Sequence, residues 1–262
     1  MGMVINSEIK KLFVGNEEVK EAYIGSNKIY SKQVDIVPEN YVIIAPQNDL
    51  QISYRGRTPS DYIEYCVFES PDNVVWNKLN SNDMINISLG FGVILLRANL
   101  VPAEKVGIGR IMIDGECFLA GNCMALLYGD ESSGKTAITY DYAFYGLFSS
   151  CLGISFVDYS FLPATSLSAY CYGNMFRGCT NMAVAPLLPA TDLVGGCYDS
   201  MFYNCQSLNT IYANFKTTPN DDYTKQWVSG VAGNGVFYRN KNASWNVIGN
   251  NGIPSGWTIQ NL

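Results

Sequence analysis

The most regular pattern of apolar residues lies in the second half of the chain. Leu162-Pro-Ala-Thr recurs 26 positions later as Leu188-Pro-Ala-Thr, and apolar residues follow both blocks at matching distances. A fixed period of this length predicts a solenoid with stacked ladders of side chains, because no single repeat can bury its apolar face alone. The matching pairs are Cys171 and Cys197, Met175 and Met201, Phe176 and Phe202, and Cys179 and Cys205.

Both ends of the repeated region are less regular. A weaker earlier copy ends in Phe144-Tyr-Gly-Leu-Phe-Ser-Ser-Cys-Leu, two residues out of phase with the later copies. Residues 214–262 break the period, and terminal repeats are usually atypical because they shield the open end of an array. We therefore predict a solenoid domain over residues 108–262, with a C-terminal cap from about residue 214.

Residues 34–107 show short apolar runs separated by Pro, Gly, Asn and Asp. Such runs at regular spacing predict the strands of a small, immunoglobulin-like β-sandwich domain. Trp76 is expected to pack in the core of this sandwich, with a ligand platform as the alternative role. The expected strands are residues 41–45, 50–54, 62–68, 74–79, 84–89 and 93–98.

The start of the chain contains a short doublet. Phe13-Val-Gly-Asn is followed by Tyr23-Ile-Gly-Ser, and alternating apolar and charged residues come after each. Gly-Asn and Gly-Ser are typical two-residue hairpin loops, so each copy predicts strand, turn and strand. Two short hairpins have too little surface to fold alone. We predict that residues 1–33 form an anchoring β-hairpin segment, which pairs with another chain or subunit or packs on the next domain.

Composition narrows the classes of function. The net charge of −6 argues against a nucleic-acid partner, since phosphate binding needs clustered Lys and Arg. The chain has no His, so the commonest general base and metal ligand are missing and an enzyme is less expected. No export signal or bilayer-length apolar stretch is visible, and we expect no membrane insertion. These features favour either a cytoplasmic protein or a part of an assembly, such as a virion released by lysis.

The eight cysteines form no C-x-x-C pair. Without His the zinc-finger spacings fail, and a disulfide framework is typical of small secreted domains rather than of a chain like this one. Free Cys is among the most buried residue types. We therefore predict small, buried thiols at these positions.

One segment matches a nucleotide-binding motif. Gly129-Asp-Glu-Ser-Ser-Gly134-Lys135-Thr136 has the G-x-x-x-x-G-K-[ST] pattern, in which backbone N–H groups hold phosphates, Lys reaches the outer phosphates and Thr binds magnesium. Residues 124–128 resemble the strand that precedes such a loop. No helical pattern follows Thr136 and no alternating βαβ pattern surrounds it, so a solvent-exposed turn before the first repeat is the favoured interpretation.

Two further candidates carry weaker signals. Asp221 and Asp222 could bind calcium, but two adjacent carboxylates lack the number of ligands that a calcium site needs, and a solvated loop is favoured. The repeat tyrosines could form an aromatic face on which sugars stack, although packing inside the solenoid is at least as common a role. These tyrosines are Tyr170, Tyr172, Tyr198 and Tyr203.

The repeat resembles the 26-residue leucine-rich repeats of BspA-like bacterial surface proteins, through the blocks Met175-Phe-x-x-Cys179-x-x-Met182 and Met201-Phe-x-x-Cys205-x-x-Leu208. Met182 departs from the Leu that the pattern prefers. The resemblance covers about residues 110–262 and implies adhesion or surface display without catalysis. The N-terminal doublet looks like segments at the starts of phage tail and fibre proteins, and with no export signal it favours a virion component.

Together these observations predict a mainly β protein with an N-terminal hairpin anchor, a small β-sandwich and a leucine-rich-repeat solenoid. The expected function is a structural virion protein of a phage that infects gut bacteria, either a head or tail fibre or a decoration protein. Its partners would be other virion proteins, copies of itself (a trimer by analogy with phage fibres) and a host-surface protein or glycan. No catalytic, metal or cofactor site is expected. The alternatives are a bacterial cell-surface adhesin and a P-loop nucleotide-binding enzyme.

Overall fold

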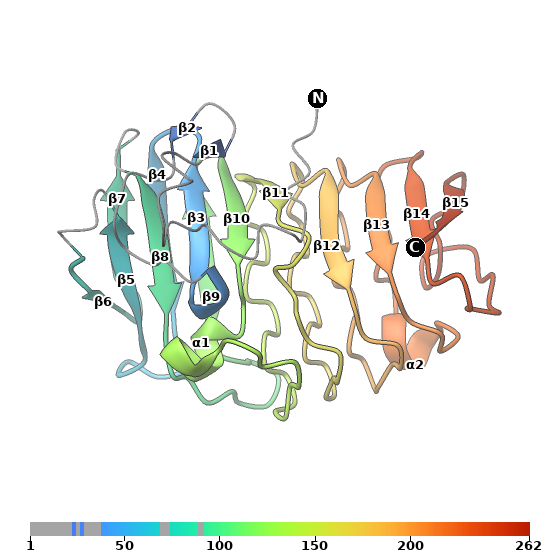
Figure 1. Cartoon of the computed structure of the whole chain (residues 1–262), viewed down its shortest axis with the longest axis horizontal. Coiled ribbons are helices and arrows are strands. Elements are labelled where there is room, and N and C mark those ends of the chain that lie inside the picture. Colours follow the sequence, from blue (N-terminus) through green and yellow to red (C-terminus); the bar gives the residue numbers. More distant parts are fainter. Residues whose placement is uncertain (1–22, 25–26, 29–37, 69–73, 89–91) are drawn as a thin grey trace, which may run out of the picture.

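The computed structural model describes residues 23–24, 27–28, 38–68, 74–88 and 92–262. The protein is mainly β, with 31% strand and 6% helix. Figure 1 shows a β-sandwich at one end of the long axis and a β-solenoid at the other, with strands lying side by side across both. The mainly β class predicted from the sequence is confirmed.

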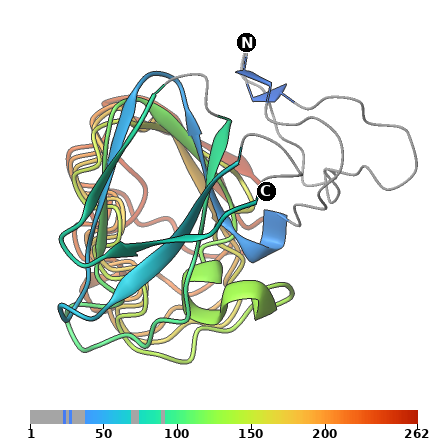
Figure 2. The ribbon, with the colours of Figure 1, turned by 90° about the vertical axis from the view of Figure 1, so that its left-hand side faces the viewer.

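Two sheets form the sandwich (Figure 2). The larger sheet contains β3 (Val42–Pro46), β5 (Tyr62–Phe68), β6 (Asn77–Asn80), β8 (Val93–Arg97), β10 (Cys117–Gly121) and β11 (Ile154–Val157). The smaller sheet contains β4 (Leu50–Arg55), β7 (Met84–Ile87) and β9 (Arg110–Asp114). Their orders are β11-β10-β3-β8-β5-β6 and β7-β4-β9, and the neighbours are antiparallel except for the parallel pair β10 and β11.

The six strands predicted between residues 34 and 107 are confirmed as β3 to β8, although β6 begins later than expected. Two further strands complete the sandwich after residue 107. β9 pairs with β4, and β10 pairs with β3. The sandwich therefore extends to Gly121, because β9 forms an edge of the smaller sheet and β10 lies between β3 and β11 in the larger sheet.

The main hydrophobic core runs through both parts of the protein. Along β4, the buried residues Leu50, Ile52 and Tyr54 alternate with more exposed ones, as expected for a strand with one face on a core. The same cluster of buried side chains continues from Val42 in β3 to Trp257 near the last strand. Since β11 pairs in parallel with β10, the first strand of the solenoid also extends the larger sheet of the sandwich.

A short helical segment connects the sandwich to the repeats. It consists of α1 (Ala125–Tyr128) and the 3-10 turn η2 (Gly129–Glu131), where the sequence suggested a strand over residues 124–128. That expectation was wrong. The Asn122 side chain accepts a hydrogen bond from the Met124 N–H at 2.9 Å, and the Ala125 carbonyl accepts one from the Ala98 N–H at 3.0 Å. These contacts, together with the high helix propensity of Ala and Leu, favour a helical turn.

The solenoid comprises about three turns. Its parallel sheet has the order β12-β13-β14-β15, and the short helix α2 (Asp221–Thr224) lies between β13 and β14 in the sequence. The strands are β12 (Val184–Leu188), β13 (Thr210–Ala213), β14 (Val236–Arg239) and β15 (Thr258–Asn261). β14 and β15 belong to the segment predicted as a cap, and they continue the parallel ladder of the repeats.

The other side of each turn is a run of tight turns. The N–H groups of Phe144 and Phe148 donate to carbonyls of the next solenoid turn, those of Cys171 and Met175, at 2.7 and 2.9 Å. Leu147, between them, donates to the carbonyl three residues earlier in its own turn, at 3.2 Å. This backbone bends repeatedly into the left-handed region, which Gly and Asn enter most easily. The positive-φ positions are Tyr142, Gly146, Ser150, Tyr170, Asn174, Gly178, Gly196, Ser200, Asn204, Gln226 and Gly230.

Side chains repeat in register inside the solenoid, as the 26-residue period predicted. Phe148, Phe176 and Phe202 stack with ring centres 5.8 and 6.0 Å apart. A second ladder joins Tyr172 to Tyr198 at 6.1 Å, with the ring planes only 4° apart. Aromatic pairs of this kind contribute roughly 0.5–1.5 kcal/mol beyond the burial of their area. The stacked ladders therefore link each turn to the next.

The N-terminal hairpin is described only in part. β1 (Tyr23–Ile24) and β2 (Asn27–Lys28) pair antiparallel, as expected for the second copy of the doublet. The first copy lies outside the described residues, so the anchoring role of residues 1–33 stays a prediction. The chain then enters the sandwich through the 3-10 turn η1 (Pro38–Asn40).

Candidate binding surfaces

The segment that matches the nucleotide-binding motif begins with η2 and continues as an irregular loop against the sandwich. α1 precedes it, and after Thr136 the chain enters turns in which Ala137 is bridged to Ser166 of the next solenoid turn. The Lys135 ammonium group lies 5.3 Å from the centre of the Tyr128 ring. A phosphate-binding loop needs a strand before it and a helix after it. The surroundings of this loop therefore differ from those of a P-loop on both sides.

Contacts within the protein hold this loop in place. The Asp130 carboxylate accepts hydrogen bonds from Arg97 at 2.6 Å. The Ser132 hydroxyl donates to the backbone carbonyl of Glu39 at 2.8 Å. These bonds tie the loop to the end of β8 and to η1, so the side chains of Asp130 and Ser132 have structural partners.

Arg97 also orders the aromatic residues on the outer side of the larger sheet. Its Nε donates to Glu64 of β5 at 2.8 Å, and its guanidinium group lies 4.0 Å from the centre of the Trp76 ring. Tyr41 stacks on the same ring at 5.4 Å. Trp76 is half-buried on this outer side, outside the core between the two sheets, so its predicted position in the core was wrong. Because Tyr41 and Arg97 both lie on its ring, it is not a free ligand platform.

A polar cavity of about 260 Å³ opens beside this cluster. Its charged lining residues are Asp61, Glu64, Arg97 and Asp130. Glu64 and Asp130 already form ion pairs with Arg97 at 2.8 and 2.6 Å. The charges that line the cavity are thus largely paired with each other.

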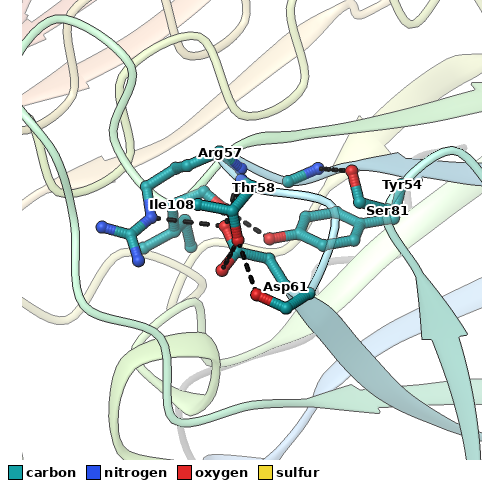
Figure 3. Close-up of polar contacts among 8 residues, drawn as sticks. Tyr54, Arg57, Thr58, Asp61, Ser81 and Ile108 are labelled. Atoms are coloured by element: carbon teal, nitrogen blue, oxygen red, sulfur yellow. Dashed lines mark hydrogen bonds and ion pairs between the residues drawn. The ribbon is translucent and has the colours of Figure 1, made fainter.

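Asp61 organises the loop at the rim of this cavity (Figure 3). Its carboxylate accepts hydrogen bonds from the N–H groups of Arg57 and Thr58 at 2.7 and 2.9 Å, and from the Thr58 hydroxyl at 3.0 Å. Burial opposes the charged form, but the hydrogen bonds from Thr58 and Arg57 outweigh it and lower the pKa of Asp61. We infer from this arrangement that Asp61 stabilises the loop.

The four tyrosines considered for sugar binding do not share a surface. Tyr172 and Tyr198 are fully buried and belong to the interior ladder. Tyr170 lies half-buried on the run of tight turns, stacked on Tyr142 at 4.8 Å, and Tyr203 lies elsewhere on that side. These four residues therefore do not form one sugar-binding face, because alternate positions of the turns point inward and outward.

Asp221 and Asp222 begin the helix α2 instead of lying in an open loop. The Asn220 side chain accepts a hydrogen bond from the Asp222 N–H at 2.8 Å and caps the helix. Asp221 accepts a hydrogen bond from Asn251. Within the described residues, Cys, Asp and Glu side chains nowhere gather in a group of three that could hold a metal ion.

The predicted buried thiols are confirmed. Burial raises the pKa of each thiol above its usual value, so that the thiols stay protonated near neutral pH. The buried free cysteines are Cys66, Cys117, Cys123, Cys151, Cys171, Cys179, Cys197 and Cys205.

The solenoid sheet has an outward side that the sequence analysis did not single out. We use the term "outer face" for the side chains of Tyr159, Val184, Leu187, Thr210, Tyr212, Val236, Tyr238, Thr258 and Gln260. Tyr212 and Tyr238 stack at 4.7 Å, and Tyr159 meets Tyr212 edge to face at 5.1 Å. Burial, together with the neighbouring phenols of Tyr238 and Tyr159, raises the pKa of Tyr212.

The signal for this outer face was present in the sequence. Tyr212 and Tyr238 are 26 positions apart and lie in runs, Thr-Ile-Tyr-Ala and Val-Phe-Tyr-Arg, whose alternation fits half-buried strands. Their alternate neighbours Ile211 and Phe237 are fully buried. The pattern was missed because these runs lie between the more conspicuous Cys, Met and Phe blocks.

The fold thus defines a mainly β protein in which a sandwich and a solenoid share one core. Among the described residues, no helix has the length and apolar character needed to cross a membrane. No protein-family model, no curated protein and no solved structure matches the chain.

Proposed function

We propose that this protein is a structural virion protein of a phage that infects gut bacteria, as a head or tail fibre or a decoration protein. Its immunoglobulin-like sandwich supports a BspA-like leucine-rich-repeat solenoid, which displays a surface for a host glycan or host-surface protein. The outer face, with its three neighbouring tyrosines, is the observation that carries the binding role. The resemblance of the Met-Phe-x-x-Cys blocks to BspA-like repeats supports the assignment as a surface-display protein.

The outer face suits an extended, uncharged ligand. Its side chains are Tyr, Thr, Val, Leu and Gln, with no acidic or basic group among them. Parallel strands lie about 4.8 Å apart, so equivalent side chains recur at a fixed spacing along the solenoid. Tyr212 and Tyr238 stack on each other at 4.7 Å, so the ring sides that face each other are covered and the phenol hydroxyl groups are the polar groups that these residues contribute. A hydroxyl-rich polymer that forms hydrogen bonds along this row is therefore the favoured ligand.

The rigidity of the support favours a display role. Ladder hydrogen bonds join β13, β14 and β15 residue by residue, and the interior aromatic rings stack beneath them. A surface held in this way loses little conformational entropy when it binds a ligand. Binding then depends on the sum of repeated contacts rather than on one pocket.

The binding role is tested with a panel of host and mucosal glycans and with intact host cells. We expect the protein to bind, and we expect Tyr212→Ala and Tyr238→Ala to weaken binding about tenfold or more, as loss of a well-placed contact does. Tyr203→Ala is the matched control, because this half-buried tyrosine lies on the run of tight turns. Equal binding by all three variants and the unchanged protein would contradict the role of the outer face.

The virion assignment is tested separately, by mass spectrometry of purified phage particles from the source community. We expect peptides of this chain at many copies per particle. Deletion of residues 1–33 is expected to remove the protein from particles while leaving ligand binding intact. Detection only in the bacterial envelope fraction would contradict the virion assignment and favour the cell-surface adhesin.

A further inference from the structure

Among the described residues, β15 is an exposed edge strand of the solenoid sheet. β15 pairs with β14 on one side, and all four of its residues are exposed. The Thr258 N–H donates to the Gly235 carbonyl at 2.9 Å, and the Leu262 N–H donates to the Arg239 carbonyl at 2.8 Å. Backbone groups alternate in direction along a strand, so the N–H and C=O groups of the residues at positions 259 and 261 point away from β14.

The side chains at this edge show that the core is incompletely covered there. Ile259 continues the interior row formed by Ile211 and Phe237. Ile211 and Phe237 are fully buried, whereas Ile259 is 38% exposed, because no further turn lies over it in the described structure. Leu262 is also 38% exposed. An apolar surface beside unpaired backbone groups is a favourable site for another strand.

Charge indicates which partner this edge accepts. Residues 242–262 contain no Asp, Glu, Lys or Arg, although the whole chain has a net charge of −6. The edge strand at the opposite end, β6, carries Lys78, the kind of charge by which proteins protect an edge from pairing. Two copies of an acidic protein repel each other least where both surfaces are uncharged. The C-terminal end therefore suits a second copy of the same chain.

We propose that β15 pairs antiparallel with β15 of a second copy, about a two-fold axis at Gln260. In this register Ile259 lies opposite the partner subunit's Asn261, and each such pair exchanges two backbone hydrogen bonds, about four in total. The same residues meet from both sides, so the contact is self-complementary and closes at two copies. Each Ile259 also gains cover from the partner's end surface.

Sedimentation of the full chain tests this proposal. We expect a dimer at micromolar concentration. Asn261→Pro removes an outward N–H without touching the bonds to β14, and Ile259→Lys places like charges at the contact. Because both copies carry each change, we expect the dissociation constant to rise about 100-fold or more in either variant. Leu152→Lys is the matched control, since Leu152 is 55% exposed on the first solenoid turn and should leave the dimer unchanged.

Hydrogen exchange gives a second measurement that needs no variant. The amides of Ile259 and Asn261 are expected to be protected at high protein concentration and to lose protection on dilution, while the amide of Thr258 stays protected by its bond to Gly235. Circular dichroism establishes that each variant is folded. A monomer throughout the micromolar range, a trimer, or a dimer that persists in folded Asn261→Pro and Ile259→Lys overturns the proposal.

Discussion

The thiol of Cys205 donates a hydrogen bond to the backbone carbonyl of Phe176, one solenoid turn earlier, at 3.0 Å. Cys179 makes the same contact with Phe148 at 3.2 Å. A buried thiol is small enough to fit between stacked turns and still offers a weak donor. This geometry explains why the repeat places a cysteine at this position and shows that its role is to join successive turns.

Removing this contact is expected to weaken the solenoid moderately. Cys205→Ala loses the S–H donor and leaves a small cavity, so the free energy of unfolding should fall by about 1–2 kcal/mol. Urea unfolding followed by tryptophan fluorescence measures the change. Leu152→Ala, at an exposed position in the first turn, should stay within about 0.5 kcal/mol of the unchanged protein. Equal effects of the two substitutions would contradict the role of the thiol.

Glycine at position 196 is required by both backbone and packing. Its φ is +64°, and a Cβ there would overlap the Tyr170 ring. Gly196→Ala should therefore lower the unfolding free energy by about 2 kcal/mol or more. Gly146→Ala, with φ of +65° but no atom within 4 Å, should cost only the backbone strain, about 1 kcal/mol.

Gly233→Ala is the control for both glycine substitutions. A Cβ at this position meets nothing within 4 Å, so stability should stay the same or rise slightly. Thermal unfolding of the three variants under the same conditions measures the order of their stabilities. If Gly196→Ala were as stable as Gly233→Ala, the description of Tyr170 as packed on Gly196 would be contradicted.

Removal of two buried tyrosine hydroxyl groups, those of Tyr54 and Tyr198, should have different effects on the stability of the protein. The Tyr54 hydroxyl donates to the Ile108 carbonyl at 2.7 Å (Figure 3), so Tyr54→Phe should destabilise the protein by about 1–2 kcal/mol. The buried hydroxyl of Tyr198 has no partner among the described residues. Tyr198→Phe should therefore leave stability unchanged or raise it by up to about 1 kcal/mol. A loss of stability in Tyr198→Phe equal to that in Tyr54→Phe would contradict this assignment.

Stability is expected to fall in alkaline solution. Burial raises the pKa of Cys151, Cys197 and Cys205 to about 12, whereas an unfolded thiol titrates near a pKa of about 8.5. Between these values the folded state keeps protons that the unfolded state loses, so stability is complete below about pH 8.5 and declines as the pH rises toward 12. Each thiol contributes a slope of about 1.4 kcal/mol per pH unit.

Urea unfolding under reducing conditions from pH 8 to pH 10 measures this slope. Cys205→Ala should reduce it by the contribution of one thiol, which separates the cysteines from other titrating groups. A stability that stays constant across this range would show that the thiols are not buried as described.

Much of this architecture could be predicted from the sequence. The 26-residue period predicted the stacked interior, because Phe176 and Phe202 can be buried only against the neighbouring turns. Short apolar runs predicted six strands of the sandwich, and the low polarity of Cys predicted its burial. These features depend on local patterns that recur along the chain, so no knowledge of distant contacts was needed.

The tertiary structure decided the remaining features. Residues 125–128 form α1 because the end of β8 supplies partners for their carbonyls, and Trp76 packs outside the core because Tyr41 and Arg97 lie on its ring. Which of the repeat tyrosines are buried depends on the path of each tight turn, which buries Tyr172 and Tyr198 and leaves Tyr170 half-buried. The open edge at β15 likewise follows from the stacking of turns. These properties arise from contacts between residues far apart in the chain, and a linear pattern does not encode them.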